Sequence, residues 1–447
     1  MTAVAGRGTG PPRTRPAPAR RRGIRAAAQG SLLAVRVLIV TVTVFQRFVL
    51  PVHAFEVLIA LPVALLVLGV MVISGQAAAD ARKTVLYVAA VGACVVANTV
   101  STSVGASLTA SFSSTELLAV LYIPLCFQLQ GPLRTRFTEV LEFFQRLMLA
   151  AAVICVGQFL AQWRGYWEFT DLERKVVPSS WLVAPEAYNY SYPQNYGSGI
   201  FKSNGIVFLE PSFCSQFLAL AIVVQIVLGA RYWRLALLGA ALVTTMSGTG
   251  ILLLAVGLAV LAIRRGGKWA TRAFVAVGVT VAVIVPFTPQ LTDRAGELGT
   301  SGSSGNTRFV ASYTNVLDAV SRDGGALAYG RGGGTIDRDA DFFNPNGLLA
   351  DYPALPKLVG EYGLPAALLF VAFVLTVFLM RTPSPTLGAC AVMLYFVLSG
   401  SLLQPPIVVL CWTITGLFAA GPPAVSRLPV RRTPLADPSP TPTEEAG

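Results

Sequence analysis

The chain has 447 residues, of which 54% are hydrophobic and 13% are charged, and its formal net charge is +12. Soluble domains are about 25% charged, and a soluble core does not grow fast enough with chain length to bury this much apolar surface. The composition therefore excludes an ordinary soluble protein and indicates a chain whose solvent is largely lipid.

The N-terminus is strongly basic. Seven arginines fall within the first 25 residues, in a stretch that is rich in Pro and Gly and contains no acid. Arginine clusters beside a membrane span stay in the cytoplasm and contact anionic lipid. We therefore expect residues 1–30 to be a disordered basic cytoplasmic tail, and we expect no nucleic acid partner.

Long apolar runs then follow one another along the chain. A helix needs about 20 apolar residues to cross the hydrocarbon, and the runs are too continuous for the alternating pattern of a membrane barrel. Residues 31–427 are predicted to form an all-α polytopic bundle of about 12 transmembrane helices. The expected spans are 32–51, 54–74, 84–103, 114–129, 144–162, 206–229, 233–248, 249–264, 269–288, 357–380, 385–402 and 404–420. The short seventh and eighth spans could instead form one broken or re-entrant unit.

The placement of basic residues predicts the orientation. Loops with Arg and Lys face the cytoplasm, and with the N-terminal tail inside, every short inner loop is basic. These loops carry Arg82, Lys83, Arg134, Arg136, Arg146, Arg231, Arg234, Arg264, Arg265, Lys268, Arg272 and Arg381. Both termini are then cytoplasmic in a multi-pass plasma-membrane protein. Two long loops, 163–205 and 289–356, lie outside, and the Pro- and Thr-rich tail 428–447 is expected to be disordered.

Metal and nucleotide cofactors are not expected. The six cysteines all lie in apolar runs and resemble small buried hydrophobic residues, and the chain has a single histidine, His53. A His/Cys metal site is therefore not predicted. The glycine-rich stretch 330–335 lacks the GK[ST] sequence and the preceding strand of a phosphate-binding loop. We interpret it as a flexible turn that allows close backbone approach to a ligand.

Polar residues gather where the sixth span begins. Lys202, Asn204 and Glu210 lie in the segment KSNGIVFLEPS, residues 202–212. One interpretation is structural, with Asn204 capping the helix and Glu210 interacting with its positive end. The other is a polar mouth facing the first outer loop, and the two are compatible. The aromatic residues of that loop suit either the membrane interface or sugar faces.

The second outer loop offers further candidates. Arg308 and Arg331 are two of its five arginines, and a guanidinium fork suits phosphate oxygens. A single loop arginine is more often a solvated charge. Because this loop has five arginines, a phosphate role is plausible for at least one of them. Glu361 opens the tenth span and could cap it or pair near the interface. The stretch TTMSGTG, residues 244–250, could be a packing contact or a polar floor beneath the loops.

These segments, in this order, resemble the polysaccharide polymerases of the Wzy type and the related O-antigen ligases. The resemblance covers roughly residues 140–380. It rests on SNGIVFLEPSFCSQFLALAIVV (203–224), TTMSGTGILLLAVGL (244–258), NTRF (306–309), GRGGGT (330–335) and KLVGEYGLPAALLF (357–370). The segment FLEPS is the most specific part.

The resemblance implies a membrane glycosyltransferase without metal or nucleotide cofactor. Such enzymes join oligosaccharides carried on a polyprenyl diphosphate outside the membrane, where loop arginines hold the diphosphate leaving group. Arg308 then matches the loop arginine, Lys202 a basic residue before the FLEPS segment, and Glu210 its acid. Fixed guanidinium groups would stabilise the charge that develops on the diphosphate. Partners would be this lipid-linked substrate, the bilayer and other polysaccharide export proteins.

The chain departs from the ligase pattern at one place. Ligases of this superfamily usually have a histidine shortly before the helix that begins like KLVGEYG, whereas residues 344–357 contain none. Asp351 and Tyr352 occupy that neighbourhood, which favours a polymerase. We predict Arg308, Glu210 and Asp351 as catalytic, with either carboxylate as the base. Substrate binding is assigned to Lys202, Asn204, Arg331, Tyr352 and Glu361.

Two other functions fit the sequence less well. A transporter or flippase for a lipid-linked or polar solute should carry paired charges deep in several spans, but here polarity gathers in the outer loops. The third possibility is a non-catalytic scaffold of a polysaccharide export assembly.

Overall fold

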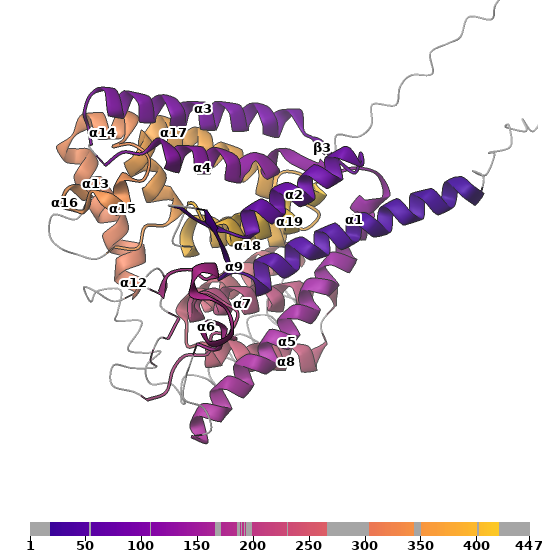
Figure 1. Ribbon diagram of the computed structural model, residues 1–447. Helices are drawn as coiled ribbons and strands as arrows, with labels where there is room; N and C mark the ends of the chain where they lie inside the picture. Colours follow the sequence, from indigo (N-terminus) through magenta and orange to yellow (C-terminus); the bar gives the residue numbers. More distant parts are fainter. Residues whose placement is uncertain are drawn as a thin grey trace, which may run out of the picture.

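The computed structural model describes most of the helical part of the chain. The described residues are 18–52, 55–107, 109–165, 171–185, 188, 190–191, 193, 199–229, 231–265, 304–343, 350–399 and 402–419. His53, the expected span 269–288 and the C-terminal tail 428–447 lie outside them, as do residues 1–17 of the N-terminal tail. Within the described residues the chain is mainly helical, which confirms the all-α membrane class (Figure 1).

Four described helices are long and apolar enough to cross a membrane on their own. They are α3 (Ala81–Ser103), α5 (Phe137–Trp163), α7 (Pro211–Leu228) and α17 (Ala354–Leu379). Shorter apolar helices are α2 (Ala60–Ile73), α4 (Phe112–Tyr122) with η1 (Ile123–Cys126), α8 (Tyr232–Thr244), α9 (Gly248–Arg265), α18 (Pro385–Met393) with η8 (Leu394–Leu398), and α19 (Pro405–Ile414) with η9 (Gly416–Phe418). Each expected span within the described residues overlaps one helix, and the total of about 12 stays a prediction.

The first two expected spans have different boundaries in the structure. Helix α1 (Pro18–Val44) begins before residue 32 and ends before residue 51. A hairpin follows, in which β1 (Val49–Val52) pairs antiparallel with β2 (Phe55–Leu58). The apolar run therefore continues past the helix, because apolar strand residues satisfy the same hydropathy count. A second hairpin joins β3 (Ala77–Ala79) to β4 (Phe127–Leu129).

Local sequence explains several helix boundaries. The Asp80 carboxylate accepts hydrogen bonds from the backbone N–H groups of Arg82 and Lys83, which caps α3. Pro211 is the first residue of α7, where its missing N–H is not needed. Helices α8 and α9 remain two helices, separated at Met246, whose φ is 45°. If the seventh and eighth expected spans instead form one broken or re-entrant unit, its break would also lie at Met246.

One set of helix ends meets the segments that were predicted to lie outside. The backbone N–H of Ser203 donates to Thr244 at the end of α8 (3.0 Å), and that of Val183 donates to Arg47, just after α1 (2.9 Å). The backbone N–H of Gly333 donates to the Asn98 side chain near the end of α3 (2.7 Å). These contacts place the ends of α1, α3 and α8 beside the two long loops.

The opposite helix ends meet one another. The Lys83 ammonium donates to the carbonyl of Gly416 (2.9 Å), which ties the start of α3 to the end of α19. A cavity lined by Phe137, Leu228, Arg264 and Ser384 gathers α5, α7, α9 and the start of α18. The helix ends described here thus fall into two groups, and the orientation of these groups in the membrane stays a prediction.

Short helices of the second long loop cover one end of the bundle. They are α12 (Ser304–Asn306), η7 (Thr307–Ala311), α13 (Ser312–Arg322), α14 (Gly324–Tyr329), α15 (Thr335–Arg338) and α16 (Ala340–Phe343). Figure 1 shows α13 to α16 at the ends of α3 and α17 that lie far from the start of α1. The first long loop contributes α6 (Leu172–Val176) and η3 (Ser179–Trp181).

The glycine-rich turn packs its backbone against a break in α17. Gly363, inside α17, has a φ of 76°, which interrupts the helix. The backbone N–H groups of Arg331 and Gly332 donate to the carbonyls of Gly360 and Glu361 at 3.0 and 2.8 Å. A Cβ at Gly330 would lie 2.3 Å from the Glu361 backbone, so only glycine fits. The sequence predicted a close backbone approach to a ligand at this turn, whereas the structure shows a close approach to α17.

Replacing Gly363 by Ala should sharply reduce the yield and thermal stability of the protein. The added Cβ would lie 2.6 Å from the Ala328 backbone, and a positive φ alone costs a non-glycine residue roughly 1–3 kcal/mol. Thermal unfolding in detergent measures the effect. Gly92→Ala in α3 is the control, because its Cβ meets nothing within 4 Å. Equal midpoints for the two variants would contradict the packing described here.

Candidate functional site

Arg308 connects the second long loop to the helix bundle. It lies in η7, a π-helical segment, and its guanidinium forms an ion pair with Asp351. Its Nε donates to the Asp351 carboxylate at 2.9 Å, and its Nη1 donates to the carbonyl of Leu398 at 3.1 Å. The Arg308 side chain is 14% exposed and that of Asp351 is 42% exposed. Two of the three predicted catalytic residues are therefore in direct contact.

The Leu398 carbonyl also brings Arg308 close to α7. Leu398 ends η8, a second π-helical segment, and its carbonyl accepts a further hydrogen bond from Nε2 of Gln216 on α7 (3.3 Å). Isolated π turns occur frequently at functional sites, because they shift backbone groups out of the regular helical ladder. The Arg308 side chain connects the two π-helical segments, because it extends from η7 and binds the last residue of η8.

Glu210 stands immediately before α7, at the same mouth. Its carboxylate accepts a hydrogen bond from the Ser212 hydroxyl (2.8 Å). Burial raises the pKa of the nearby Tyr188 phenol to about 12, and the charges of Glu210 and Asp351 add to the rise. A hydrogen bond between Tyr188 and Gln404, at the start of α19, opposes it. The electrostatic neighbourhood of Tyr188 thus contains both predicted carboxylates.

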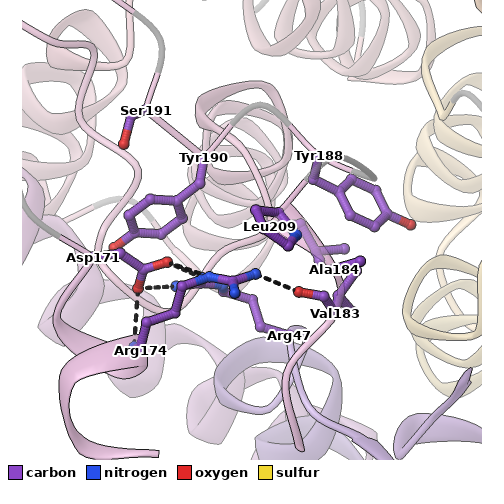
Figure 2. A pocket seen from close by; sticks show the side chains of 10 residues that line it. Arg47, Asp171, Arg174, Val183, Ala184, Tyr188, Tyr190, Ser191 and Leu209 are labelled. Carbon is purple, nitrogen blue, oxygen red and sulfur yellow. Dashed lines mark hydrogen bonds and ion pairs between the residues drawn. The ribbon is translucent and has the colours of Figure 1, made fainter. Parts of the chain in front are cut away.

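A pocket of about 360 Å³ opens beside this cluster. Figure 2 shows it between the first long loop and the segment that follows α1. Tyr188 and Leu209 line it, so the pocket shares Tyr188 with the cluster and reaches the residue before Glu210. Its other lining residues are Arg47, Asp171, Arg174, Val183, Ala184, Pro185, Tyr190 and Ser191.

Arg47 is the central buried charge of this region. Its Nη1 donates to Asp171 at 2.8 Å and lies 2.9 Å from a Glu173 carboxylate oxygen. Its guanidinium stacks 4.0 Å from the centre of the Tyr190 ring. Arg47 was not predicted as a site residue, because it lies within the apolar run 32–51. An arginine near the end of such a run was the available signal.

The buried turn before Glu210 holds Lys202 and Asn204. The Asn204 carboxamide oxygen accepts from Nε2 of Gln158 (3.2 Å) and from the backbone N–H of Ile206 (2.9 Å). Lys202 is also buried. Asn204 is therefore a structural residue, although it stabilises a loop rather than capping α7, whose cap position is taken by Glu210.

Two further predicted binding residues, Arg331 and Glu361, lie in a separate network at the glycine-rich turn. Arg331 contacts Asp323 and Asp339 at 3.5 and 3.4 Å and stacks 3.8 Å from the centre of the Phe342 ring. Glu361 is fully buried, with Lys357 at 3.9 Å. These contacts anchor the loop to α17, so the structure does not place Arg331 and Glu361 with Arg308.

Tyr352 follows Asp351 in the chain but points into a small apolar cluster. It packs with Val316, Ala319, Ile336 and Phe343. Its hydroxyl accepts a hydrogen bond from the Asn315 carboxamide (3.2 Å). Tyr352 therefore fixes the backbone position of its neighbour Asp351.

A comparison with family models identifies the chain. The model of the WcaD colanic acid polymerase family matches residues 34–419. The chain belongs to this family. No curated protein and no solved structure matches it significantly. Membership in the family makes the chain a membrane-embedded polysaccharide polymerase, which confirms the predicted kind of protein.

The polymerase family match includes every residue of the cluster and the pocket. It begins within α1 and ends after α19, so it leaves out the basic N-terminal stretch and the C-terminal tail. Among the described residues there is no group of three or more His, Cys, Asp or Glu side chains that could hold a metal ion.

Glu173 should give the polymerase a measurable pH dependence. Burial raises the pKa of its carboxyl to about 7, repulsion from Asp171 adds to the rise, and attraction to Arg47 opposes it. The folded protein thus keeps a proton that the unfolded chain releases near pH 4.5, so stability from this group falls as the pH rises from about 4.5 to about 7.

The variant Glu173→Gln should remove that part of the pH dependence. We expect its thermal unfolding midpoint to fall less than that of the wild type between about pH 5 and about pH 8. Glu142→Gln, on an exposed position of α5, is the control and should follow the wild type. Parallel curves for wild type and Glu173→Gln would show that Glu173 does not titrate in this range.

Proposed function

We propose that this polymerase joins oligosaccharide units carried on a polyprenyl diphosphate, on the extracytoplasmic face of the membrane. The contact of Arg308 with Asp351 and Leu398, together with Tyr188, on which the charges of Asp351 and Glu210 both act, is the observation that carries the proposal. It gathers a guanidinium fork and two carboxylates at one mouth of a helical bundle. Transfer of a glycosyl group from a diphosphate needs both kinds of group.

Arg308 is the residue that holds the diphosphate. In the structure the Arg308 guanidinium binds the Asp351 carboxylate. Two oxygens of a phosphate group present a similar pair of hydrogen-bond acceptors. Asp351 is nearly half exposed, so it can give up the guanidinium to the incoming substrate. The negative charge that develops on the departing diphosphate would then be stabilised by the fixed Arg308 guanidinium, at a site with little water.

Glu210 is the base. The acceptor hydroxyl attacks the anomeric carbon of the donor sugar, and its proton passes to the Glu210 carboxylate. The bond between that carbon and the diphosphate oxygen breaks, and the polyprenyl diphosphate leaves with the bonding electrons. Diphosphate is a good leaving group, so the protein mainly positions the reactants and neutralises charge.

The charge distribution favours this chemistry over transport. A transporter should carry ionisable side chains deep within its spans. Helices α7, α18 and α19 contain no charged residue. The polar groups gather at the mouth, where the loops meet the helix ends.

Arg308→Ala should reduce polymerisation by about a hundredfold or more, because one charge-stabilising group commonly contributes that much. Arg308→Lys should also be impaired, since a point charge lacks the fork. The measurement is the initial rate and length distribution of polysaccharide at equal protein levels.

The control for this series is Arg322→Ala. Arg322 is an exposed arginine of the same loop, bonded to the carbonyls of Asp318 and Phe342, and its variant should keep full activity. Normal polymer length in Arg308→Ala would overturn the role of Arg308. Full activity of Arg308→Lys would show that charge alone suffices.

Single cysteines test the membrane orientation. All six native cysteines are buried, so background labelling should be low. Ser321→Cys on α13 should react with an impermeant maleimide in intact cells, and Arg231→Cys, between α7 and α8, should react only after lysis. The reverse pattern would place the Arg308 cluster in the cytoplasm and end the proposal.

A further inference from the structure

The pocket beside the cluster has its own chemistry, distinct from that of Arg308. Its walls come from the first long loop and the end of α1, whereas Arg308 and Asp351 come from the second long loop. The two regions share Tyr188, and Leu209 precedes Glu210 in the chain. A ligand in the pocket therefore lies next to the proposed base.

The arginines of the pocket are already compensated. Arg47 is 4% exposed, and its guanidinium is engaged by Asp171, Glu173 and the Tyr190 ring. Arg174 contacts Asp171 at 3.2 Å and donates to the carbonyl of Val183 at 2.6 Å. A diphosphate entering the pocket would have to displace two acids from these cations. The region is therefore a poor diphosphate site.

The same groups suit an uncharged ligand with many hydroxyls. Figure 2 shows Tyr188 and Leu209 on one side of the pocket and the Arg174 guanidinium beside Asp171, whereas the Arg47 guanidinium lies against the Tyr190 ring. Tyrosine rings pack against the apolar faces of sugar rings while hydrogen-bonding groups bind the hydroxyls at the edge. The Arg174 side chain is 26% exposed, and the hydroxyl of Ser191 also lines the pocket. The volume falls in the range of small-molecule sites.

We propose that this pocket is the acceptor subsite, which binds a terminal sugar residue of the chain that receives the new unit. This inference rests on the proposed polymerase reaction and adds the position of its second substrate. The sugar packs against Tyr188 and Leu209, and Arg174 and Ser191 bind its hydroxyls. Its attacking hydroxyl faces Glu210, while the donor diphosphate lies on the Arg308 side of Tyr188.

Arg47 is a positioning residue in this arrangement. It does not reach the ligand, but it holds Asp171 in place, and Asp171 in turn binds Nε of Arg174. Its backbone carbonyl also accepts the N–H of Val183. Arg47 thus fixes the wall that carries Arg174.

Binding and turnover of the full-length protein in lipid nanodiscs test the subsite. The probe is the free repeat-unit oligosaccharide, released from lipid-linked intermediates of the host and freed of phosphate. Calorimetry should show binding to the wild type and about tenfold weaker binding to Arg174→Gln, the loss typical of one charged hydrogen bond. Arg322→Gln is the matched control and should bind like the wild type.

A second measurement separates this inference from the proposed reaction. With a lipid-linked donor, Arg174→Gln should raise the KM for the acceptor about tenfold and leave kcat and the KM for the donor unchanged. Arg308→Ala should lower kcat while oligosaccharide binding persists. Inorganic diphosphate should not displace the oligosaccharide.

Several outcomes would overturn the acceptor subsite. They are equal oligosaccharide binding by wild type and Arg174→Gln, absence of binding by the wild type, displacement by inorganic diphosphate, and a raised KM for the donor instead of the acceptor. Failure of the polymerase reaction looks different, because the wild type would then bind the oligosaccharide and form no polymer.

Discussion

The ion pair of Arg308 with Asp351, together with the hydrogen bond from Arg308 to the Leu398 carbonyl, determines how the second long loop meets the bundle. The contact joins two π-helical segments, and Gln216 extends it to α7. Because Arg308 stays partly accessible and Asp351 is nearly half exposed, the same contact can hold the loop in the resting protein and receive an anionic substrate.

Other charged side chains of the first and second long loops and of the segment after α1 are held by several partners at once. Arg47 is surrounded by Asp171, Glu173 and Tyr190, and Arg331 by two aspartates and Phe342. Removing one partner of such a group leaves an uncompensated buried charge, which is strongly destabilising. These networks therefore fix loop position. Arg47, whose side chain is 5% exposed, is less accessible than Arg308 at 14% and Arg174 at 26%.

The sequence alone was enough to predict the described helices and to single out Arg308, Asp351 and Glu210 as candidate site residues. Apolar runs located each described span, since hydropathy and length alone decide whether a helix suits lipid. Arg308, Glu210 and Asp351 were predicted as catalytic residues. Arg308 and Asp351 are in direct contact, and the catalytic role of all three stays a prediction. Arg331, Glu361 and Tyr352 were grouped with them, but the structure places them in packing networks, because partners far along the chain decide whether a polar residue is closed off. Arg47 was missed for the same reason: its partners are more than 120 residues away. The π-helical segments leave no simple sequence pattern.

The position of Glu210 supports its assignment as the base over Asp351. It occupies the residue before α7, where the helix N-terminus favours a negative charge, and its carboxylate accepts a hydrogen bond from the neutral Ser212 hydroxyl. A base must be ionised before it accepts a proton, and the helix end favours that state. Asp351, in contrast, is paired with the guanidinium that would bind the leaving group. If Asp351 were the base, proton transfer would remove the charge that orients Arg308 at the moment when the diphosphate departs. Division of the two tasks between two carboxylates avoids this conflict, and it agrees with a pocket that is lined by Leu209, the residue before Glu210.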